Sequence, residues 1–383
     1  MKKALKSNLI VLPSGIFDGY VIIENGKIAD VTAAAPDCEV CDLSGNYVMA
    51  GFIDIHTHGG GGFSFTESSP AEIVAGCNFH LGHGTTTIVP TVTTGAFPIM
   101  REAVKNIQIA KADKNARGNI LGAHMEGPYL SPAQCGAQAP EHITEPKPDE
   151  YISLLEETGD TIVRWTYAPE RDTEGKFCKY LTDRGIIVSA GHTDAKYADM
   201  ARAIENGCNL ITHLYSCTST VTRDHGFRSL GVIESTYLRN ELTAEIIADG
   251  KHLPPDLVRM IVKIKGIDRV AAVTDSLCVA GSDAKEGVMS GVAYIVEDGI
   301  AKLSDRSAFA GSVATADVLL RVLVNECGFT LSEASTMLSA TPAKLHKLNK
   351  GKIEQGLDAD FVVLDNSLKV QKVFVNGNLY KGD

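Results

Sequence analysis

Eight short apolar runs, each followed by a stretch with helical patterning, limit the fold of this chain more than any other feature. The runs occupy residues 51–58, 85–93, 119–127, 161–170, 185–193, 209–216, 242–252 and 269–276. Strands that alternate with helices in this way are typical of βα units that build a parallel sheet. Eight units predict a closed (β/α)8 TIM barrel, in which catalytic groups gather at the carboxyl ends of the strands.

The two ends of the chain instead read as short strands joined by tight turns. Asn25-Gly26 near the start and Asn376-Gly377 near the end are strong signals for two-residue hairpin turns. A barrel of this class uses about 250 residues, so part of the 383-residue chain is left for other structure. We therefore predict a small β-sandwich domain formed by residues 1–49 with 349–383, and a barrel over residues 50–348.

The segment after the eighth run interrupts the βα pattern. Asp298-Gly299 predicts the turn of a β-hairpin, and we expect an insertion near residues 287–312 that lies over the barrel mouth. Helical patterns then run through residues 314–328 and 330–348.

The charge balance excludes several classes of partner. The chain has 36 Lys and Arg against 47 Asp and Glu, which gives a formal net charge of −11. Nucleic-acid binding and binding to an anionic membrane both need a basic face, so neither is expected. No apolar stretch approaches the ~20 residues that span a bilayer, and the nine scattered cysteines favour reduced thiols over a disulfide framework. We expect a cytoplasmic protein.

All eight runs end in polar residues, although strands of a parallel barrel are otherwise apolar. These residues are His56 and His58, Thr91 and Thr93, Glu126, Glu170, His192, His213, His252 and Asp275. A single histidine in such a place is more often a hydrogen-bonded core residue than a ligand. Convergence of several histidines from separate strands onto one rim predicts a functional site.

The types of these residues predict a metal centre. His56 and His58 lie on the same side of a strand because side chains alternate with period two, so both imidazoles can reach one ion. His192 and His213 come from later strands, and the Glu126 carboxylate can bind one ion or bridge two. Nitrogen and oxygen ligands suit Zn2+ or Fe2+, and an open site of this kind is suited to hydrolysis of an amide or ester.

Asp275, at the end of the eighth run, is the candidate proton carrier. Amide hydrolysis needs a base to take a proton from the attacking water and an acid to give one to the departing amine. Two other interpretations stay open, in which Asp275 caps a following helix or is a further metal ligand. Thr274 and Ser276 beside it are able to share either task.

Several motifs resemble those of the amidohydrolase superfamily and, among its members, most closely the N-acetylglucosamine-6-phosphate deacetylases. The motifs are GFIDIHTHG, AHMEGPYLSP, SAGHT, THLYS and VTDS, and the terminal β unit and GKIEQGLDADFVVLD extend the resemblance over nearly the whole chain. The resemblance implies that Glu126, His192 and His213 hold the main ion and that His56 and His58 help to hold a second. It also implies that Asp275 is the general acid/base, that one or two divalent ions bind per subunit, and that the protein is a homodimer.

The same resemblance marks substrate-binding positions, where the match is weaker. Ala137 and Gln138 take the place of a segment that contacts the sugar, with Gln138 where a histidine is common. Ser216 and Cys217 stand where the family usually has Asn-Ala. His252 matches a residue that contacts substrate or polarises the acetyl carbonyl, and the phosphate-binding arginine is either Arg223 or Arg228. Both arginines are also compatible with an ordinary surface loop.

The function that this resemblance implies is hydrolysis of the N-acetyl group of N-acetylglucosamine 6-phosphate to glucosamine 6-phosphate and acetate. Cyclic-amide hydrolases of the superfamily commonly carry a modified lysine at the end of strand four, where this chain has Arg164 and its neighbours. A related substrate remains an alternative, either N-acetylgalactosamine 6-phosphate or another N-acyl compound. A non-catalytic scaffold with the same fold is the remaining alternative.

Overall fold

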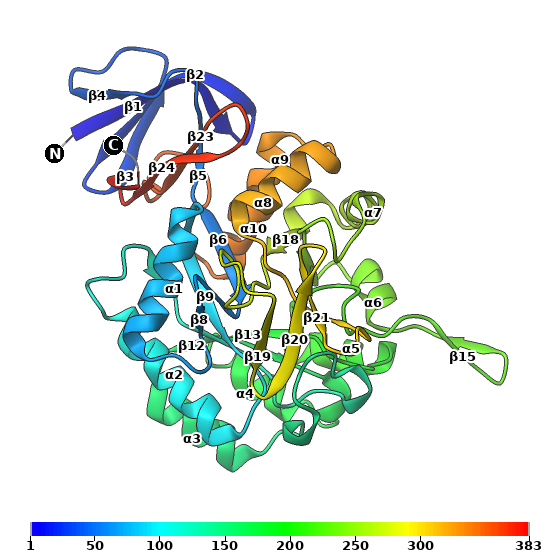
Figure 1. Ribbon diagram of the computed structural model, residues 1–383. Helices are drawn as coiled ribbons and strands as arrows, with labels where there is room; N and C mark the ends of the chain where they lie inside the picture. The colour runs from blue at the N-terminus through cyan, green and yellow to red at the C-terminus, as the bar shows by residue number, and fades with distance from the viewer. Residues whose placement is uncertain (1, 382–383) are drawn as a thin grey trace.

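The computed structural model describes residues 2–381 and places them in a barrel and a smaller sheet domain (Figure 1). The barrel strands follow one another in space as they do in the sequence. In order they are β6 (Phe52–Thr57), β9 (Thr85–Val92), β11 (Ala123–Glu126), β12 (Ile162–Tyr167), β13 (Ile187–Ala190), β14 (Leu210–Ile211), β17 (Thr243–Ile247) and β18 (Val270–Val273). A two-residue strand, β10 (Asn119–Ile120), pairs with β9 just before β11.

Each barrel strand runs parallel to its neighbours. The ring of strands is closed between β18 and β6, where two main-chain hydrogen bonds join the residues at their ends. Asp275 N donates to His56 O at 2.9 Å, and His58 N donates to Ser276 O at 2.8 Å. β6 and β9 are buried along their whole length, as expected for strands of a parallel barrel, and β6 carries the buried polar residues Asp54 and His56 among its apolar ones. The predicted (β/α)8 barrel is confirmed.

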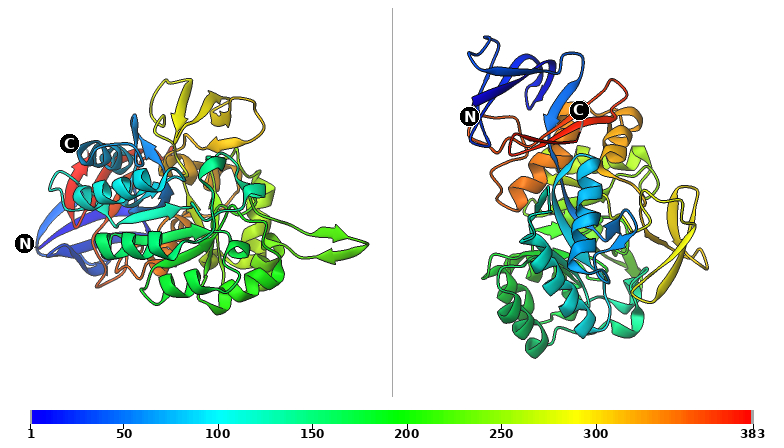
Figure 2. Two further views of the ribbon diagram at one scale, coloured as in Figure 1. Left: turned by 90° about the horizontal axis from the view of Figure 1, so that it is seen from below. Right: turned by 60° about the vertical axis from the view of Figure 1, so that its left-hand side comes forward.

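Helices cover the outside of the barrel (Figures 1 and 2). They are α1 (Pro70–Gly82), α2 (Phe97–Lys111), α3 (Pro148–Thr158), α4 (Lys176–Thr182), α5 (Tyr197–Glu205), α6 (Val232–Leu238), α7 (Pro255–Lys265) and α8 (Ala316–Arg321). Local sequence fixes their starts. At α1, Ser69 N donates to the Glu72 carboxylate at 2.8 Å and Pro70 occupies the first turn, where no N–H is needed.

The helical patterns after the insertion form a run of short helical segments. They are α8, the π-helical turn η5 (Val322–Glu326), α9 (Leu331–Ser335), η6 (Thr336–Ala340) and α10 (Thr341–Leu345). Single 3-10 turns occur elsewhere in the loops: η1 (Pro132–Gln134), η2 (Pro140–His142), η3 (Pro169–Arg171) and η4 (Ile267–Arg269).

The small domain is one sheet built from both ends of the chain. Its strands are β1 (Lys2–Leu12), β2 (Gly15–Glu24), β3 (Lys27–Thr32), β4 (Glu39–Asp42), β5 (Tyr47–Ala50), β23 (Phe361–Leu364), β24 (Val370–Val375) and β25 (Asn378–Lys381). Asn25-Gly26 and Asn376-Gly377 turn the chain with positive φ, as predicted. The expected sandwich is a single sheet that curls around its own apolar core, and Ala359 N closes it by donating to Gly26 O at 2.9 Å. The division at residues 49/50 and 348/349 stays a prediction.

The segment after β18 is larger than the predicted hairpin. It forms a four-stranded antiparallel sheet of β19 (Glu286–Met289), β20 (Val292–Glu297), β21 (Ile300–Leu303) and β22 (Phe309–Gly311). Asp298-Gly299 makes the β20–β21 turn as predicted, and Ser290-Gly291, which the prediction did not include, makes the β19–β20 turn with positive φ at both residues. Two short hairpins complete the fold, β7 (Gly59–Gly60) with β8 (Phe63–Ser64) and β15 (Thr222–Asp224) with β16 (Phe227–Ser229).

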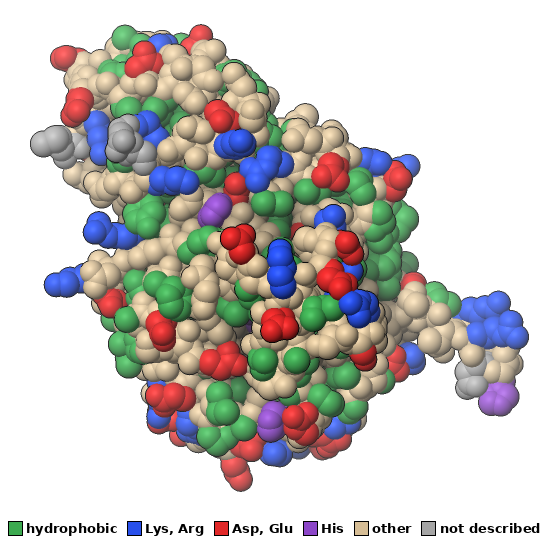
Figure 3. Space-filling view, viewed as in Figure 1, with side chains coloured by type: hydrophobic (Ala, Val, Ile, Leu, Met, Phe, Trp, Pro, Cys, Tyr) green, Lys and Arg blue, Asp and Glu red, His purple; other side chains and the backbone are tan. Residues whose placement is uncertain are grey.

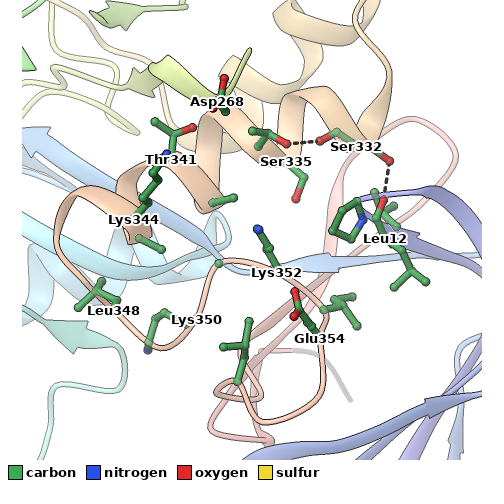
Figure 4. A pocket seen from close by; sticks show the side chains of 18 of the residues that line it. Leu12, Asp268, Ser332, Ser335, Thr341, Lys344, Leu348, Lys350, Lys352 and Glu354 are labelled. Carbon is green, nitrogen blue, oxygen red and sulfur yellow. Dashed lines mark hydrogen bonds between the residues drawn. The ribbon is translucent and has the colours of Figure 1, made fainter. Parts of the chain in front are cut away.

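A cavity of about 610 Å³ lies at the seam between the small domain and the barrel (Figure 4). Leu12 from β1, Ser332 from α9, and Lys352 and Glu354 from the segment before β23 contribute to its wall. Ile267, also in the wall, precedes β18, so the seam cavity lies at the amino-terminal end of the barrel strands. The amino-terminal end of a TIM barrel usually contributes to the stability of the fold rather than to catalysis.

Among residues 2–381, no helix combines the length and apolar character needed to cross a membrane.

Candidate metal centre

Six polar side chains converge at the carboxyl ends of the barrel strands. They come from β6 and the loop after it, from the end of β11, and from the loops after β13, β14 and β18: His56, His58, Glu126, His192, His213 and Asp275. Each has at most 7% of its surface exposed. The fold therefore brings the five predicted metal ligands and the predicted proton carrier into one cluster.

Glu126 lies at the centre of this cluster and belongs to two groups of ligand atoms. His192 Nε2 and His213 Nε2 lie 3.2 and 3.1 Å from Glu126 Oε1. His56 Nε2 lies 3.3 Å from Oε1, and His58 Nε2 lies 3.2 Å from Oε2. Within each group the ligand atoms are all within 4.8 Å of one another. Two neighbouring groups that could each hold a divalent ion thus share the Glu126 carboxylate.

The hydrogen bonds behind the imidazoles show that the donor set fits a metal. His192 Nδ1 faces Gln134 O at 3.0 Å and His213 Nδ1 faces Ser216 O at 3.1 Å. A carbonyl oxygen only accepts, so each Nδ1 carries a hydrogen and Nε2 is the nitrogen left to coordinate an ion. These two Nε2 atoms are 3.2 Å apart and face the same carboxylate. Two ring nitrogens and a carboxylate at this separation could hold a divalent cation.

The electrostatics of the cluster lead to the same conclusion. Burial alone would lower the pKa of His56, but Glu126, Glu245 and Asp275 raise that pKa to about 10. Burial would raise the pKa of Glu126, yet the surrounding imidazoles hold it well below its usual range. The pKa of Asp275 is likewise lowered, against its burial, by His56 and His58, whose Nε2 atoms lie 3.3 and 3.2 Å from Oδ1. The carboxylates stay ionised and attract positive charge to this point.

Three of the six side chains sit on backbone in the left-handed region. His192, His213 and Asp275 have φ of 47°, 28° and 48°. Such backbone costs of order 1–3 kcal/mol per non-glycine residue, and it gathers at functional sites where surrounding structure holds it. Each of these residues lies two positions beyond the end of a barrel strand, so the turn re-aims its side chain just after the strand ends.

A cavity of about 280 Å³ opens beside the cluster. Its wall includes five of the predicted substrate-binding residues: Ala137, Gln138, Ser216, Cys217 and His252. Gln138 Nε2 donates to Glu126 Oε2 at 2.6 Å, and its Oε1 accepts from Thr94 N at 3.0 Å. His252 Nδ1 bonds the Asp249 carboxylate at 2.8 Å, which fixes the orientation of that ring. The two bonds of Gln138 thus hold its side chain against Glu126, one of the predicted metal ligands.

The two arginines predicted to bind phosphate do not line this cavity. Arg223 and Arg228 pair across the β15–β16 hairpin, which projects from the body of the molecule (Figures 1 and 2). Both are exposed, as is Phe227 at 80%. Figure 3 shows the gathering of basic side chains on this arm. Sequence spacing after THLYS suggested proximity to the site, but the intervening chain leads outward instead.

Other residues at the site carry little sequence signal. Met289 and Phe309, from the inserted sheet, form an apolar part of the wall. Glu245, buried in β17, bonds His56 Nδ1 at 2.8 Å. Its only signal is an acidic residue inside the apolar run LTAEIIADG. The rim residue Glu170 instead accepts from Asp194 N at 2.7 Å and so supports the loop that follows His192.

Comparison with known proteins gives relatives over nearly the full length. N-acetylglucosamine-6-phosphate deacetylase from Lysinibacillus sphaericus is 30% identical, with 94% of this chain and 92% of the relative covered. The protein of the same name from Haemophilus influenzae is 31% identical, with 98% and 99% covered. N-acetylgalactosamine-6-phosphate deacetylase from a Shewanella species is also 31% identical, with 88% and 84% covered.

Solved structures agree with these relatives. N-acetylglucosamine-6-phosphate deacetylase from Pasteurella multocida matches with a TM-score of 0.91 and 29% identity, covering 100% of both chains. A mutant of the Mycobacterium smegmatis deacetylase, in complex with N-acetyl-D-glucosamine-6-phosphate, matches with a TM-score of 0.91 and 28% identity, covering 99% of both chains. The sequence pattern of the Amidohydrolase family matches residues 47–380. The chain belongs to the amidohydrolase family, as its motifs predict.

Proposed function

We propose that this protein is a metal-dependent deacetylase that hydrolyses the acetamide of N-acetylglucosamine 6-phosphate to glucosamine 6-phosphate and acetate. One observation supports this above all others: Asp275 lies against a buried cluster of candidate ligands that borders a cavity of about 280 Å³. An acid/base group beside a Lewis-acid site is what amide hydrolysis requires. The names of the relatives agree with this substrate.

Glu126, His192 and His213 would hold one divalent ion and His56 and His58 would help to hold a second, and such an ion would supply a Lewis acid that polarises a carbonyl and lowers the pKa of water. Zn2+ and Fe2+ suit these nitrogen and oxygen ligands. The ionised Asp275 carboxylate accepts a proton from the attacking water. It then returns that proton to the amide nitrogen as the C–N bond breaks.

Other wall residues orient the substrate in this proposal. His252, fixed by Asp249, contacts the acetyl carbonyl. Gln138, Ser216 and Cys217 offer polar groups to the sugar hydroxyls or to the phosphate. Met289 and Phe309 exclude water from the apolar side of the cavity.

The phosphate is met by Arg223 or Arg228 from a second copy of the chain. This arrangement is supported by the position of both arginines on an exposed arm that leaves its own subunit (Figure 2). The largely exposed Phe227 on the same arm is suited to an interface rather than to water. The homodimer belongs to this proposal, as does a cytoplasmic location, which the nine cysteines without disulfide partners support.

An acetate-release assay tests reaction and substrate together. The purified protein is supplied with Zn2+, Fe2+ or Mn2+ and with N-acetylglucosamine 6-phosphate, N-acetylgalactosamine 6-phosphate or unphosphorylated N-acetylglucosamine. We expect the highest kcat/KM with N-acetylglucosamine 6-phosphate. Turnover of the unphosphorylated sugar at an equal kcat/KM would contradict the phosphate site.

N-acetylgalactosamine 6-phosphate is the second candidate substrate. It is favoured by the relative from Shewanella and by Ser216 and Cys217, which depart from the usual family pattern in the cavity wall. A higher kcat/KM for this sugar would replace the first proposal. A protein that binds no divalent ion and releases no acetate would favour the scaffold alternative.

The arginine arm has its own test. Substitution of Arg223 or Arg228 by Ala is expected to raise KM for the phosphorylated sugar about tenfold or more, because a charge-assisted bond to phosphate is lost. The kcat/KM for the unphosphorylated sugar serves as control and should not change. An unchanged KM in both variants would show that neither arginine binds phosphate.

A further inference from the structure

A buried ion pair lies inside the barrel, below the metal cluster. Arg164 comes from β12 and Glu245 from β17, both are 0% exposed, and Arg164 Nη1 donates to Glu245 Oε2. The interior of a TIM barrel is normally filled with branched apolar side chains. A buried ion pair is weak evidence for stability, because desolvation of the two charges offsets their attraction. The pair therefore calls for another explanation.

The contacts of Glu245 lead to the proposed metal ligands. Its Oε1 accepts from His56 Nδ1 at 2.8 Å and from the backbone N of His213 at 3.1 Å. One carboxylate oxygen thus supports a ligand from each of the two metal positions. The other oxygen is occupied by Arg164.

The contacts of Arg164 reach the same two strands. Nη1 also donates to Ile55 O at 3.0 Å, directly before His56, and Nη2 donates to Thr212 Oγ1 at 2.9 Å, directly before His213. Nε donates to Ser189 Oγ at 3.2 Å. Because the guanidinium is planar and its donors are fixed, these bonds hold the Glu245 carboxylate in one place.

His56 differs from the other three histidines of the cluster in its support. His192 and His213 each have a main-chain carbonyl at Nδ1, and His58 Nδ1 has the Thr93 hydroxyl at 2.7 Å. Among the four, His56 has an ionised carboxylate at Nδ1. A carboxylate there keeps the hydrogen on Nδ1, leaves the lone pair on Nε2, and makes the imidazole a stronger ligand.

We propose that Glu245, held and charge-balanced by Arg164, is a positioning residue for the metal position formed by His56, His58 and Glu126, and determines whether an ion binds there. This inference rests on the proposed metal-dependent function. In this inference the ion position at His56 and His58 depends on the Arg164–Glu245 pair. The position at His192 and His213 depends mainly on the main-chain carbonyls that contact the Nδ1 atoms of these two histidines.

Metal titration of chelator-treated protein tests the inference without reference to turnover. Co2+ is the probe, and its visible absorption reports coordination while elemental analysis counts ions per chain. We expect two ions in the unsubstituted protein. Glu245→Gln should weaken the weaker-bound ion by about 10- to 100-fold, the usual effect of losing a partner behind a metal ligand, and should leave the tighter ion in place.

Two further variants separate positioning from stability. Ser189→Ala removes a contact of Arg164 without touching Glu245, and it should keep two ions. A double variant, Arg164→Met with Glu245→Leu, replaces both charges by apolar groups, so its Tm should stay the same or rise. It should nevertheless bind only one ion per chain.

Two results would overturn the inference. Two ions with unchanged affinity in Glu245→Gln, or in the folded double variant, would show that the pair does not position His56. If the unsubstituted chain and every variant bound only one ion, the Arg164–Glu245 pair would not support binding of a second ion at His56, His58 and Glu126. Both results leave the deacetylase proposal standing, whereas an unsubstituted protein that binds no ion would overturn both.

Discussion

Each end of the barrel has a cavity, and the smaller of the two borders the candidate metal centre. The carboxyl end has a cavity of about 280 Å³ that borders six converging ionisable side chains. The seam cavity at the amino-terminal end is about 610 Å³, and its wall is formed by apolar side chains, hydroxyls and charged side chains that, apart from Lys350, are exposed (Figure 4). Convergence of charged groups, and not volume, identifies the site.

The two ends also differ in how buried charge is balanced. Near the seam, Lys350 Nζ lies 2.6 Å from Asp360 Oδ2, so a buried cation and a buried anion neutralise each other within the chain. At the carboxyl end, Glu126 and Asp275 stay ionised among several imidazoles whose Nε2 atoms face the carboxylates. The buried charges near the seam are paired within the chain, whereas the cluster has the side chains that could hold a metal ion. Substitutions at the two ends should therefore affect different measurements.

The largest effect on turnover is expected from Glu126→Gln, because Glu126 belongs to both groups of ligands. The amide has the same shape but no charge, so both ions should be lost and turnover should fall on the order of 10³-fold or more. Elemental analysis and acetate release measure the two quantities.

Glu170→Gln is the matched control for that change. Glu170 lies on the same rim, but its carboxylate accepts from Asp194 N and Thr193 Oγ1 rather than facing the ligand cluster. This variant should keep its metal. Full metal content in Glu126→Gln would contradict a shared bridging carboxylate.

The difference between the ends could be predicted in part from the sequence. The barrel and the five candidate ligands depend on local patterns: apolar runs of strand length, and a polar residue where each run ends. His56 and His58 needed only the period-two alternation of a strand to be placed together. The seam cavity had no such signal, because it depends on how two domains pack.

Other features depend on contacts between distant parts of the chain. Arg164 and Glu245 are 81 residues apart, and no spacing rule links a basic residue in one apolar run to an acidic residue in another. The direction of the β15–β16 arm could not be predicted from the sequence either, because a hairpin that lies near His213 in the sequence can still point away from the site. The inserted sheet has four strands, whereas the single turn recognised in the sequence predicted a hairpin of two strands.

Asp275→Asn should give the next largest loss and should separate chemistry from metal binding. The asparagine keeps the shape of the side chain but cannot accept a proton, so we expect turnover to fall about 10²- to 10⁴-fold. Metal content should stay at the level of the unsubstituted protein. Single-turnover acetate release is the measurement, because it isolates the chemical step.

The outcome for Asp275→Asn also discriminates between the interpretations of this residue. Loss of an ion together with activity would identify Asp275 as an essential metal ligand. Near-normal turnover would leave the proton transfer to another group, such as His252 in the same wall.

The smallest effect on turnover is expected at the seam, from Lys350→Met. Removal of the lysine leaves the Asp360 carboxylate buried without its cation, which costs about 3–5 kcal/mol of stability, while the metal cluster at the other end is untouched. Denaturant unfolding should show the loss, and kcat/KM of the folded protein should not change.

Lys352→Met, at an exposed lysine of the same cavity, is the control and should change stability by less than about 0.5 kcal/mol. Combining Lys350→Met with Asp360→Leu should restore much of the stability, because neither charge is then left unpaired. A large fall in kcat/KM in either lysine variant would instead mean that the seam takes part in function, and the contrast between the two ends would fail.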